Sequence, residues 1–506
     1  MKIFTTRQIA EIDKYTIENE PIRDIDLMER ASDRMAGWLV KHIPLGKKLK
    51  IFAGPGNNGG DALAIARFMA DSGYEAEVFL IDFGKGLKGS PEINWQRLEK
   101  QNRVSLNIIE SDKDIPLTDS SEIIIDGLFG SGLSRPLEGL VSEVVKKINT
   151  GDATIISIDI PSGLMGEDNS GNIPEHIIQA DYTLTLQFPK ISFFFAENEK
   201  FVGEWVVLPI GLHPDAIKKT NSSYHLMTRQ EIAGILPQRS RFGHKGNMGH
   251  ALLIAGSYGK MGAAILASRG CLHAGAGLVT THVPRLGYQI IQTAVPEAMA
   301  SIDPSDLMFT EFPDLSRFTS VGVGPGLDKK QNTRRALFRL LEQSDRPLVI
   351  DADALNILAE HPAWLSEVPE NSILTPHPGE FRRLAGASEN SYQRLMLQKD
   401  FSQKYKVVVV LKGAFTTVAT PGGEVYFNPT GNPGMATGGS GDALTGIILG
   451  LLVQGLSPEQ AARAGVYIHG LAGDIAKNDK SEEALIAGDI VESLGKAFVE
   501  IKSSGE

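Results

Sequence analysis

Short apolar runs alternate with helical segments along the whole chain of 506 residues. Residues 61–72 and 140–148 have helical patterns, and the apolar runs of the first half lie at residues 49–54, 75–81, 122–130, 154–163 and 181–187. Strands that are apolar on both faces are typical of parallel sheets covered by helices. The alternation therefore predicts an α/β fold with right-handed crossovers between the strands.

The alternation breaks at residues 211–228, a polar stretch with a His-Pro pair and a Ser/Asn run. A second alternation follows it, with apolar runs at residues 250–257, 277–283, 320–326, 347–353, 372–380 and 406–413. The chain is also longer than a single hydrophobic core usually supports. We therefore expect two doubly wound α/β domains, residues 1–213 and 228–506, joined by a linker at residues 214–227.

Composition excludes several classes of partner and location. The formal net charge of −11 argues against binding to nucleic acid or an anionic membrane. Cys271 is the single cysteine, so no intrachain disulfide can form, and its apolar surroundings predict a buried filler. The N-terminus has no apolar signal region and looks like an amphipathic helix capped at Thr5 or Thr6, and the apolar stretch 444–453 is too short to span a bilayer. We expect a cytoplasmic homo-oligomer.

The motif GPGNNGGD at residues 54–61 lies directly after a predicted strand and before a predicted helix. Glycines at such a turn let a phosphate approach backbone N–H groups at the helix N-terminus. The motif is not the GxGxxG fingerprint, so an ordinary dinucleotide cofactor is not implied. The alternative is a tight turn in which Asp61 caps the helix.

Two further predicted strands of the first domain end in carboxylates, at Asp126 and Asp159. The carboxyl ends of neighbouring parallel strands face one crevice, so both aspartates could converge there with Asn57 and Asn58. An oxygen-only set of Asn58, Asp126 and Ser162 would suit K⁺ rather than zinc. Loop capping is the alternative role for each aspartate.

The most specific motif of the second domain is NPTGNPGMATGGSGDALTGII at residues 428–448. Its GGSGD turn before an apolar helix predicts an anion hole, with Asp442 on the first helical turn. His377, Lys412 and the carboxylates of residues 350–356 follow separate predicted strands. Each of these residues could instead stabilise its loop or cap a strand or helix. For His377 a ligand contact is favoured, because the glycine motifs are expected in the same crevice.

In order and spacing, GPGNNGGD, DGLFGSGLSRP and DIPSGL resemble the epimerase domain of NAD(P)H-hydrate repair enzymes, and LMERAS at residues 27–32 also fits. The resemblance implies a Rossmann-like domain that binds the hydrates NADHX and NADPHX. It implies that Asp159 is the acid or base for epimerisation at C6, and that Asn58, Asp126 and Ser162 hold K⁺. The implied hydrate-binding residues are Asn57, Asn58, Gly59, Gly60, Asp61, Gly130, Ser131, Gly132, Leu133, Ser134, Arg135, Pro136 and Asp159.

Over residues 228–506, HKGNMGHALLIAGS, LTPHPGEF, LKGAFTTV and GNPGMATGGSGDALTG resemble the ribokinase-like NAD(P)H-hydrate dehydratase domain. The resemblance implies hydrate contacts at Ala263, Gly326, His377 and Asp442. It also implies ADP as co-substrate, favoured over ATP by the likeness to fused bacterial-type members, and a Mg²⁺ ion can accompany the nucleotide although no dedicated metal motif is visible. The implied ADP-binding residues are Lys412, Gly413, Ala414, Phe415, Thr416, Asn432, Gly438, Gly439, Ser440 and Gly441.

The implied reaction makes chemical sense because a hydroxyl group leaves easily once it is phosphorylated. Asp442 would deprotonate that hydroxyl group for attack on the terminal phosphoryl group of the nucleotide. One alternative is a ribokinase-like vitamin or sugar kinase, against which HPGEF and the fused first domain argue. The other is a non-catalytic nucleotide-sensing scaffold, against which the presence of Asp126, Asp159 and Asp442 argues.

Overall fold

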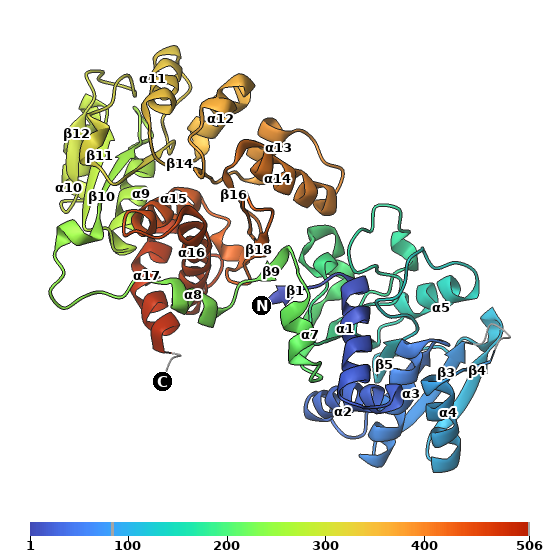
Figure 1. Cartoon of the computed structure of the whole chain (residues 1–506). Helices are drawn as coiled ribbons and strands as arrows, with labels where there is room; N and C mark the ends of the chain where they lie inside the picture. The colour runs from blue at the N-terminus through green and yellow to red at the C-terminus, as the bar shows by residue number, and fades with distance from the viewer. Residues whose placement is uncertain (82–85, 504–506) are drawn as a thin grey trace. The chain divides into compact units, whose positions relative to one another are not determined.

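The computed structural model describes residues 1–81 and 86–503, which divide into two compact units (Figure 1). The N-terminal unit comprises Lys2–Ser222 with Asn390–Tyr392, and the C-terminal unit comprises Met1, Ser223–Glu389 and Gln393–Glu506. The division falls inside the segment expected as a linker, residues 214–227. That segment holds helix α7 (Pro214–Lys219) and strand β9 (Tyr224–Leu226).

The N-terminal unit is built on a parallel seven-stranded sheet of order β4-β3-β2-β5-β6-β7-β8. Its strands are β2 (Lys48–Ala53), β3 (Ala76–Ile81), β4 (Ser105–Ile109), β5 (Glu122–Gly127), β6 (Thr154–Ile158), β7 (Tyr182–Leu186) and β8 (Glu204–Leu208). Its helices besides α7 are α1 (Thr6–Asn19), α2 (Asp24–His42), α3 (Asn57–Asp71), α4 (Ser90–Gln101), α5 (Leu140–Asn149) and α6 (Glu199–Val202).

Both faces of this sheet are buried, as the continuous apolar runs predict. Leu49 and Ile51 of β2 belong to a core that also contains residues of α2 and α3, whereas Phe52 belongs to a second core with residues of α5. Successive side chains of a strand point to opposite faces, so one apolar run serves both cores. At the start of the chain, Thr5 caps α1 in a capping box with Gln8, which confirms the predicted helix start.

The sheet of the C-terminal unit runs β9-β18-β17-β16-β15-β14-β13-β10-β11-β12. Pairing is antiparallel at β16–β17 and β17–β18 and parallel elsewhere in this order. The strands besides β9 are β10 (His250–Ile254), β11 (Leu278–Val283), β12 (Met299–Ile302), β13 (Ser320–Val323), β14 (Leu348–Ile350), β15 (Ile373–Leu374), β16 (Val408–Leu411), β17 (Thr417–Ala419) and β18 (Val425–Phe427).

Helices cover both faces of this second sheet as well, so the doubly wound α/β prediction is confirmed for both units. Leu253 lies in a core with residues of α9 (Met261–His273), α15 (Ser440–Leu452), α16 (Pro458–Lys480) and α17 (Ala487–Lys502). The adjacent Leu252 lies in the opposite core, with α11 (Gln331–Gln343) and α12 (Ala352–Glu360) (Figure 1).

Cys271 is a buried free cysteine of α9, as predicted, and burial raises the pKa of its thiol. In the described part of the chain, every helix is too short or too polar to cross a membrane.

Candidate active sites

The glycine motif of the N-terminal unit is shaped first by backbone packing. A Cβ atom at Gly54 would lie 1.9 Å from the carbonyl oxygen of Leu128, and one at Gly59 would lie 1.8 Å from the oxygen of Gly54. These two positions therefore require glycine whatever the turn binds. Helix α3 begins at Asn57 after the N-cap Gly56, so the alternative in which Asp61 caps the helix is wrong.

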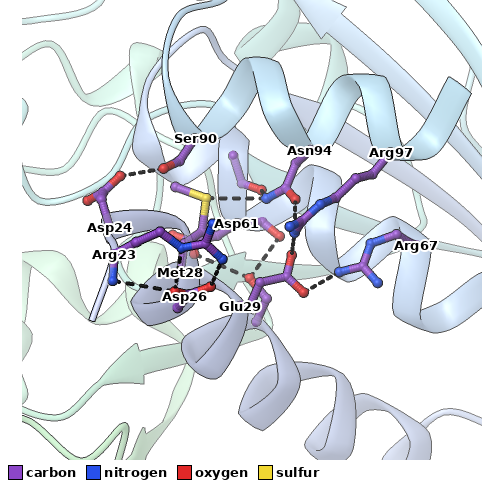
Figure 2. A network of polar contacts seen from close by, with 12 residues as sticks. Arg23, Asp24, Asp26, Met28, Glu29, Asp61, Arg67, Ser90, Asn94 and Arg97 are labelled. Carbon is purple, nitrogen blue, oxygen red and sulfur yellow. Dashed lines mark hydrogen bonds and ion pairs between the residues drawn. The ribbon is translucent and has the colours of Figure 1, made fainter. Parts of the chain in front are cut away.

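A polar network from α2 and α4 holds this turn in place (Figure 2). Asn94 Nδ2 donates to the carbonyl oxygen of Gly60 at 3.1 Å. Glu29 of α2 accepts hydrogen bonds from Arg97 at 2.8 Å and from Arg67 of α3. The contacts tie three helices together around the start of α3.

Asp61 lies inside this packing rather than on the open side of the turn. Its side chain is buried, and Oδ1 accepts from the Ser32 hydroxyl group at 3.3 Å. Burial, followed by the negative charge of Asp159, raises the pKa of Asp61 well above its ordinary value. Burial therefore disfavours ionisation of this carboxyl group, which sequence spacing did not predict.

Asp159 follows β6 in a conformation that is unusual for an aspartate, with φ at +64°. Its Oδ1 accepts from Lys190 Nζ at 2.6 Å and from the Leu186 amide at 3.1 Å. The Lys190 ammonium group is fully buried, and it also donates to Thr185 Oγ1 at 3.0 Å and to the Phe188 oxygen at 3.2 Å. Within the described residues, the hydrogen bonds to the Asp159 carboxylate all go to Oδ1, so Oδ2 can meet a ligand.

A second carboxyl group, that of Asp13 of α1, lies close enough to Asp159 and Lys190 to feel their charges. Burial, followed by the charge of Asp159, raises the pKa of Asp13 to about 6, and Lys190 opposes that shift. Asp13, Asp61 and Asp159 thus share one buried region with the Lys190 cation. A region with several carboxyl groups and perturbed pKa values can hold and move a proton near neutral pH.

The residues expected to hold K⁺ lie together at the ends of β5 and β6. Asp126 is fully buried, and its oxygens accept from Ser162 Oγ at 2.5 Å, the Ser162 amide at 2.8 Å and Ser157 Oγ at 2.8 Å. Burial raises the pKa of Asp126, and these hydrogen bonds oppose the rise. Asn58 packs next to Gly130, where an added Cβ atom would lie 3.1 Å from Asn58 Oδ1.

Asn58 also leaves a polar atom without a partner. Its buried Nδ2 has no hydrogen-bond partner within the described residues. Since buried amides are nearly always hydrogen-bonded, this side chain is expected to meet a ligand. The loop 130–136 starts beside it, and Gly132, Ser134 and Arg135 of that loop are exposed. The structure therefore brings the expected phosphate loop and the expected cation residues together, with Asn57 exposed at the start of α3.

In the C-terminal unit, two of the expected hydrate contacts follow strands β13 and β15, which lie on either side of β14 in the sheet. Gly326 comes after β13, with φ at +65°, and an added Cβ atom there would lie 3.1 Å from Cβ of Ala263 on α9. His377 comes after β15 as the N-cap of α13 (Pro378–Ala385). Its Nδ1 accepts from the Gly379 amide at 3.0 Å, and Glu380 completes the capping box.

His377 thus has a structural role, as its alternative interpretation held. The ring remains about half exposed, with Nε2 3.5 Å from Glu380 Oε1. Capping uses Nδ1, so the exposed part of the ring can still contact a ligand. Both functions are compatible with the geometry.

Asp442 lies on the first turn of α15, behind the N-cap Gly439, which has φ at +90°. Burial raises the pKa of Asp442 to about 6, with a further contribution from the charge of Asp351 and an opposing one from Lys412. Lys412 Nζ lies 3.0 Å from Asp351 Oδ1. A carboxylate with a pKa near neutrality is suited to general-base chemistry.

The residues expected around ADP form two groups. The loop after β16 is open, with Gly413 and Ala414 exposed and Thr416 Oγ1 bonded to the Gly413 amide and oxygen at 3.2 and 2.9 Å. Asn432 is fixed to Asp474 of α16 by a 3.0 Å hydrogen bond. Phe415, Gly438, Gly439, Ser440 and Gly441 complete the set.

Ser440 contacts a histidine of α16 below the glycine turn. Its hydroxyl group lies 3.3 Å from Nε2 of the buried His469, and burial lowers the pKa of that histidine to about 4. His469 is therefore neutral at physiological pH.

Comparisons with known proteins agree with this geometry. The family model "NAD(P)H-hydrate dehydratase" matches residues 251–495, and the model "YjeF-related protein N-terminus" matches residues 24–192. A bifunctional NAD(P)H-hydrate repair enzyme of Moorella thermoacetica is 35% identical, covering 98% of this chain and 96% of its own. The chain belongs to the bifunctional NAD(P)H-hydrate repair enzymes.

Other members of the family match over similar lengths. The enzyme of Coxiella burnetii is 36% identical over 97% of this chain and 98% of its own. A solved ADP/ATP-dependent NAD(P)H-hydrate dehydratase from Bacillus subtilis is 33% identical and covers 55% of this chain and 98% of its own, with a TM-score of 0.49. Full-length matches to bifunctional repair enzymes favour that interpretation over the vitamin or sugar kinase and over the scaffold.

Sequence reasoning missed two charged neighbours of the candidate catalytic Asp159. Lys190 is a lone charge in the apolar run TLQFPKISFFF, and this isolation could have indicated a buried ion pair. Asp13 lies on the buried side of α1, beside Ile9, Ile12 and Thr16, where a carboxyl group is out of place.

Proposed function

We propose that the N-terminal unit interconverts the R and S forms of NADHX and NADPHX, and that the C-terminal unit dehydrates the S form back to NADH or NADPH with ADP as co-substrate. The proposal is supported by one observation above all: both halves of the chain match bifunctional repair enzymes. Each half also has a candidate aspartate, Asp159 after strand β6 of the parallel sheet and Asp442 on the first turn of α15. Ligands of open parallel sheets bind at that end.

For the epimerase, we assign Asp159 as the acid and base at the C6 hydroxyl group. Lys190 and the Leu186 amide fix Oδ1, so Oδ2 faces the substrate. Oδ2 would accept the hydroxyl proton while the C6–N1 bond breaks and an aldehyde forms, with the bonding electrons passing to the nitrogen. Closure on the other face of the carbonyl and return of the proton would give the opposite epimer.

Asp13 would serve this step as a proton reservoir. Its pKa of about 6 leaves part of the population protonated near neutral pH, beside the Asp159 carboxylate. The hydrate phosphates would lie between the exposed start of α3 at Asn57 and the loop 130–136, where backbone amides are accessible.

A potassium ion fits the oxygen donors of Asn58, Asp126 and Ser162. The Asp126 carboxyl group is fully buried, and the groups that act on its pKa are hydroxyl and amide donors rather than cations. A bound K⁺ would supply the missing positive charge next to the phosphate loop. Replacing K⁺ by choline in the assay should slow epimerisation and leave dehydration unchanged, and equal epimerisation rates in both buffers would remove K⁺ from the proposal.

For the dehydratase, Asp442 would deprotonate the C6 hydroxyl group of the S hydrate as it attacks the terminal phosphorus of ADP. AMP would leave, and the phosphorylated hydroxyl would then depart from C6 as phosphate while a proton is lost from C5, which restores the reduced ring. The amides of the GGSGD turn and the Lys412 ammonium group would stabilise charge on the transferred phosphoryl group. A Mg²⁺ ion would neutralise nucleotide phosphates.

The hydrate itself would lie against Ala263 and Gly326, where the two residues meet, with the half-exposed His377 ring beside it. We propose that residues 1–213 and 228–506 carry the two activities and that the protein is a cytoplasmic homo-oligomer.

The test is turnover of mixed R and S hydrate by the whole chain with ADP, ATP or neither. Regain of reduced-nicotinamide absorbance should require a nucleotide, and chiral chromatography should show R and S equilibrating without one. Transfer of phosphate to a vitamin or sugar alcohol, with no regain of absorbance, would point to a kinase instead.

A further inference from the structure

Asp351 occupies a helix-cap position, but its side chain does not cap the helix. It occupies the N-cap position of α12, where an aspartate side chain ordinarily accepts from amides of the first turn. The Asp351 side chain makes no such bond. Its Oδ1 accepts from Lys412 Nζ at 3.0 Å and its Oδ2 from Thr445 Oγ1 at 2.6 Å. The next residue, Ala352, has φ at +50°, a costly conformation for alanine.

Both partners of Asp351 lead to the glycine turn of α15. A Cβ atom added to Gly441 would lie 3.2 Å from Lys412 Nζ and 3.9 Å from Asp351 Oδ2. Thr445 Oγ1 also lies 3.2 Å from the Gly441 carbonyl oxygen, one helical turn earlier. The lysine ammonium group and the carboxylate therefore lie beside the turn, and the Thr445 hydroxyl group links the carboxylate to it.

We infer that Asp351 is a positioning residue of the dehydratase site, which holds the Lys412 ammonium group against the Gly441 turn and ties the ends of β14 and β16 to α15. Lysine is a mobile point charge on a four-carbon chain, so a fixed carboxylate partner determines where that charge lies. The inference rests on the proposed function, because the turn matters as the place where phosphoryl charge develops.

The Asp351 carboxylate also raises the pKa of Asp442, the proposed general base. The charged groups that face Asp442 are Asp351, Asp353 and Glu380, which raise its pKa, and Lys412, which lowers it. Lys260 is paired with Asp353 at 3.1 Å, and His377 is paired with Glu380. Asp351→Asn removes one negative charge and leaves Lys412 unneutralised, so the pKa of Asp442 should fall below about 6.

The experiment compares wild-type protein and Asp351→Asn in S-hydrate turnover with ADP across pH. Loss of the lysine position should raise KM for ADP and lower kcat/KM by ~10²-fold, the scale of a misplaced reacting group. The acid limb of the pH profile should move to lower pH. A folded Asp351→Asn protein with unchanged KM and an unchanged acid limb would overturn the inference.

Thr445 supplies a second pair of variants that leaves charge unchanged. Thr445→Val removes the hydroxyl group that binds Asp351 and keeps the side-chain shape, whereas Thr445→Ser keeps the hydroxyl group. We expect a raised KM for ADP in the valine variant and near wild-type behaviour in the serine variant. If Asp351→Asn fails to fold, equal KM values in these two variants overturn the inference.

Asp303→Asn is the matched control for loss of a buried carboxylate. Asp303 is buried in the same unit and accepts from the Thr310 amide at 2.6 Å and the Ser305 amide at 2.8 Å. This variant should lose stability without moving the acid limb or KM for ADP. Failure of the proposed function is separate, since wild-type protein would then show no nucleotide-dependent dehydration at all.

Discussion

Lys190 Nζ lies 2.6 Å from Asp159 Oδ1, and the lysine side chain is only 1% exposed. A buried ammonium group needs acceptors for its donors, and Asp159, Thr185 and Phe188 supply them. The pair therefore fixes one oxygen of the candidate catalytic carboxylate and leaves the other for the substrate. The Asp159 carboxylate is thereby held in one orientation at the end of its strand.

Lys190→Met should lower kcat for epimerisation by ~10²-fold or more, because Asp159 loses the partner that orients it. The measurement is R-to-S conversion by chiral chromatography, with S-hydrate dehydration as an internal check that should stay unchanged. The matched control is Lys50→Met, which breaks another buried pair of the same unit, Lys50 with Glu122 at 2.7 Å. Equal epimerisation rates in the two variants would contradict the orienting role.

Asp442→Asn separates chemistry from binding. General-base loss typically costs ~10²–10⁴-fold in rate, so S-hydrate turnover should fall by that factor while ADP binding by calorimetry stays close to wild type. A helix-cap role would predict no such loss, and Gly439 already occupies the N-cap. Wild-type turnover in a folded Asp442→Asn protein would remove Asp442 from the reaction.

The same substitution should raise stability. The folded-state pKa of Asp442 is raised to about 6, so ionisation of this group is less favourable in the folded than in the unfolded chain. At low pH the group is protonated in both states and does not destabilise the folded chain. As pH rises from about 4 to about 6 the unfolded chain ionises more readily, and the free energy of unfolding falls. Asp442→Asn should therefore gain up to about 3 kcal/mol at pH about 8, measured by denaturant unfolding. A clear loss of stability would contradict a costly buried charge.

Dehydration should depend on pH through the same group. The base must be deprotonated, so kcat/KM for the S hydrate should fall to half near pH 6, where the pKa of Asp442 lies. An aspartate of ordinary pKa would keep the rate constant down to about pH 4. Initial rates with saturating ADP across this range decide between the two.

The boundary between the halves can be tested with paired fragments. Residues 1–213 and 228–506 should each fold, but the second lacks β9, whose residues pair with β18 in parallel. Loss of β9 uncovers an edge of the sheet. A fragment of residues 223–506 should therefore unfold a few degrees higher than 228–506. Equal melting temperatures would mean that β9 contributes nothing to this unit.

Sequence reasoning predicted the architecture because both sheets are buried on both faces. Runs such as residues 123–125 are apolar at consecutive positions, and the length of such a run distinguishes it from a helix. It missed β4 and β8, which have exposed or half-exposed residues, and the antiparallel β17 and β18, which are three residues each. β4 and β8 are the edge strands of the first sheet, whereas β17 and β18 lie inside the second sheet and are too short to show a pattern.

The sequence predicted the site residues that lie in glycine-rich turns or follow strands. It did not predict which distant residues pair with them. Lys190 reaches Asp159 across 31 positions, and Lys412 reaches Asp351 across 61. No local pattern links such pairs, since only the fold brings them together. The raised pKa values of Asp13 and Asp442 likewise come from burial and neighbouring charge, which appear after folding.

The most direct test of the two-site account is the fate of pure R hydrate with ADP in three proteins. Wild-type protein should convert R hydrate fully to reduced nicotinamide. Asp159→Asn should leave R hydrate unconsumed beyond its spontaneous rate, and Asp442→Asn should turn it into a mixture of R and S without any regain of absorbance. Regain of absorbance at the wild-type rate by either variant would contradict the division of the reaction between Asp159 and Asp442.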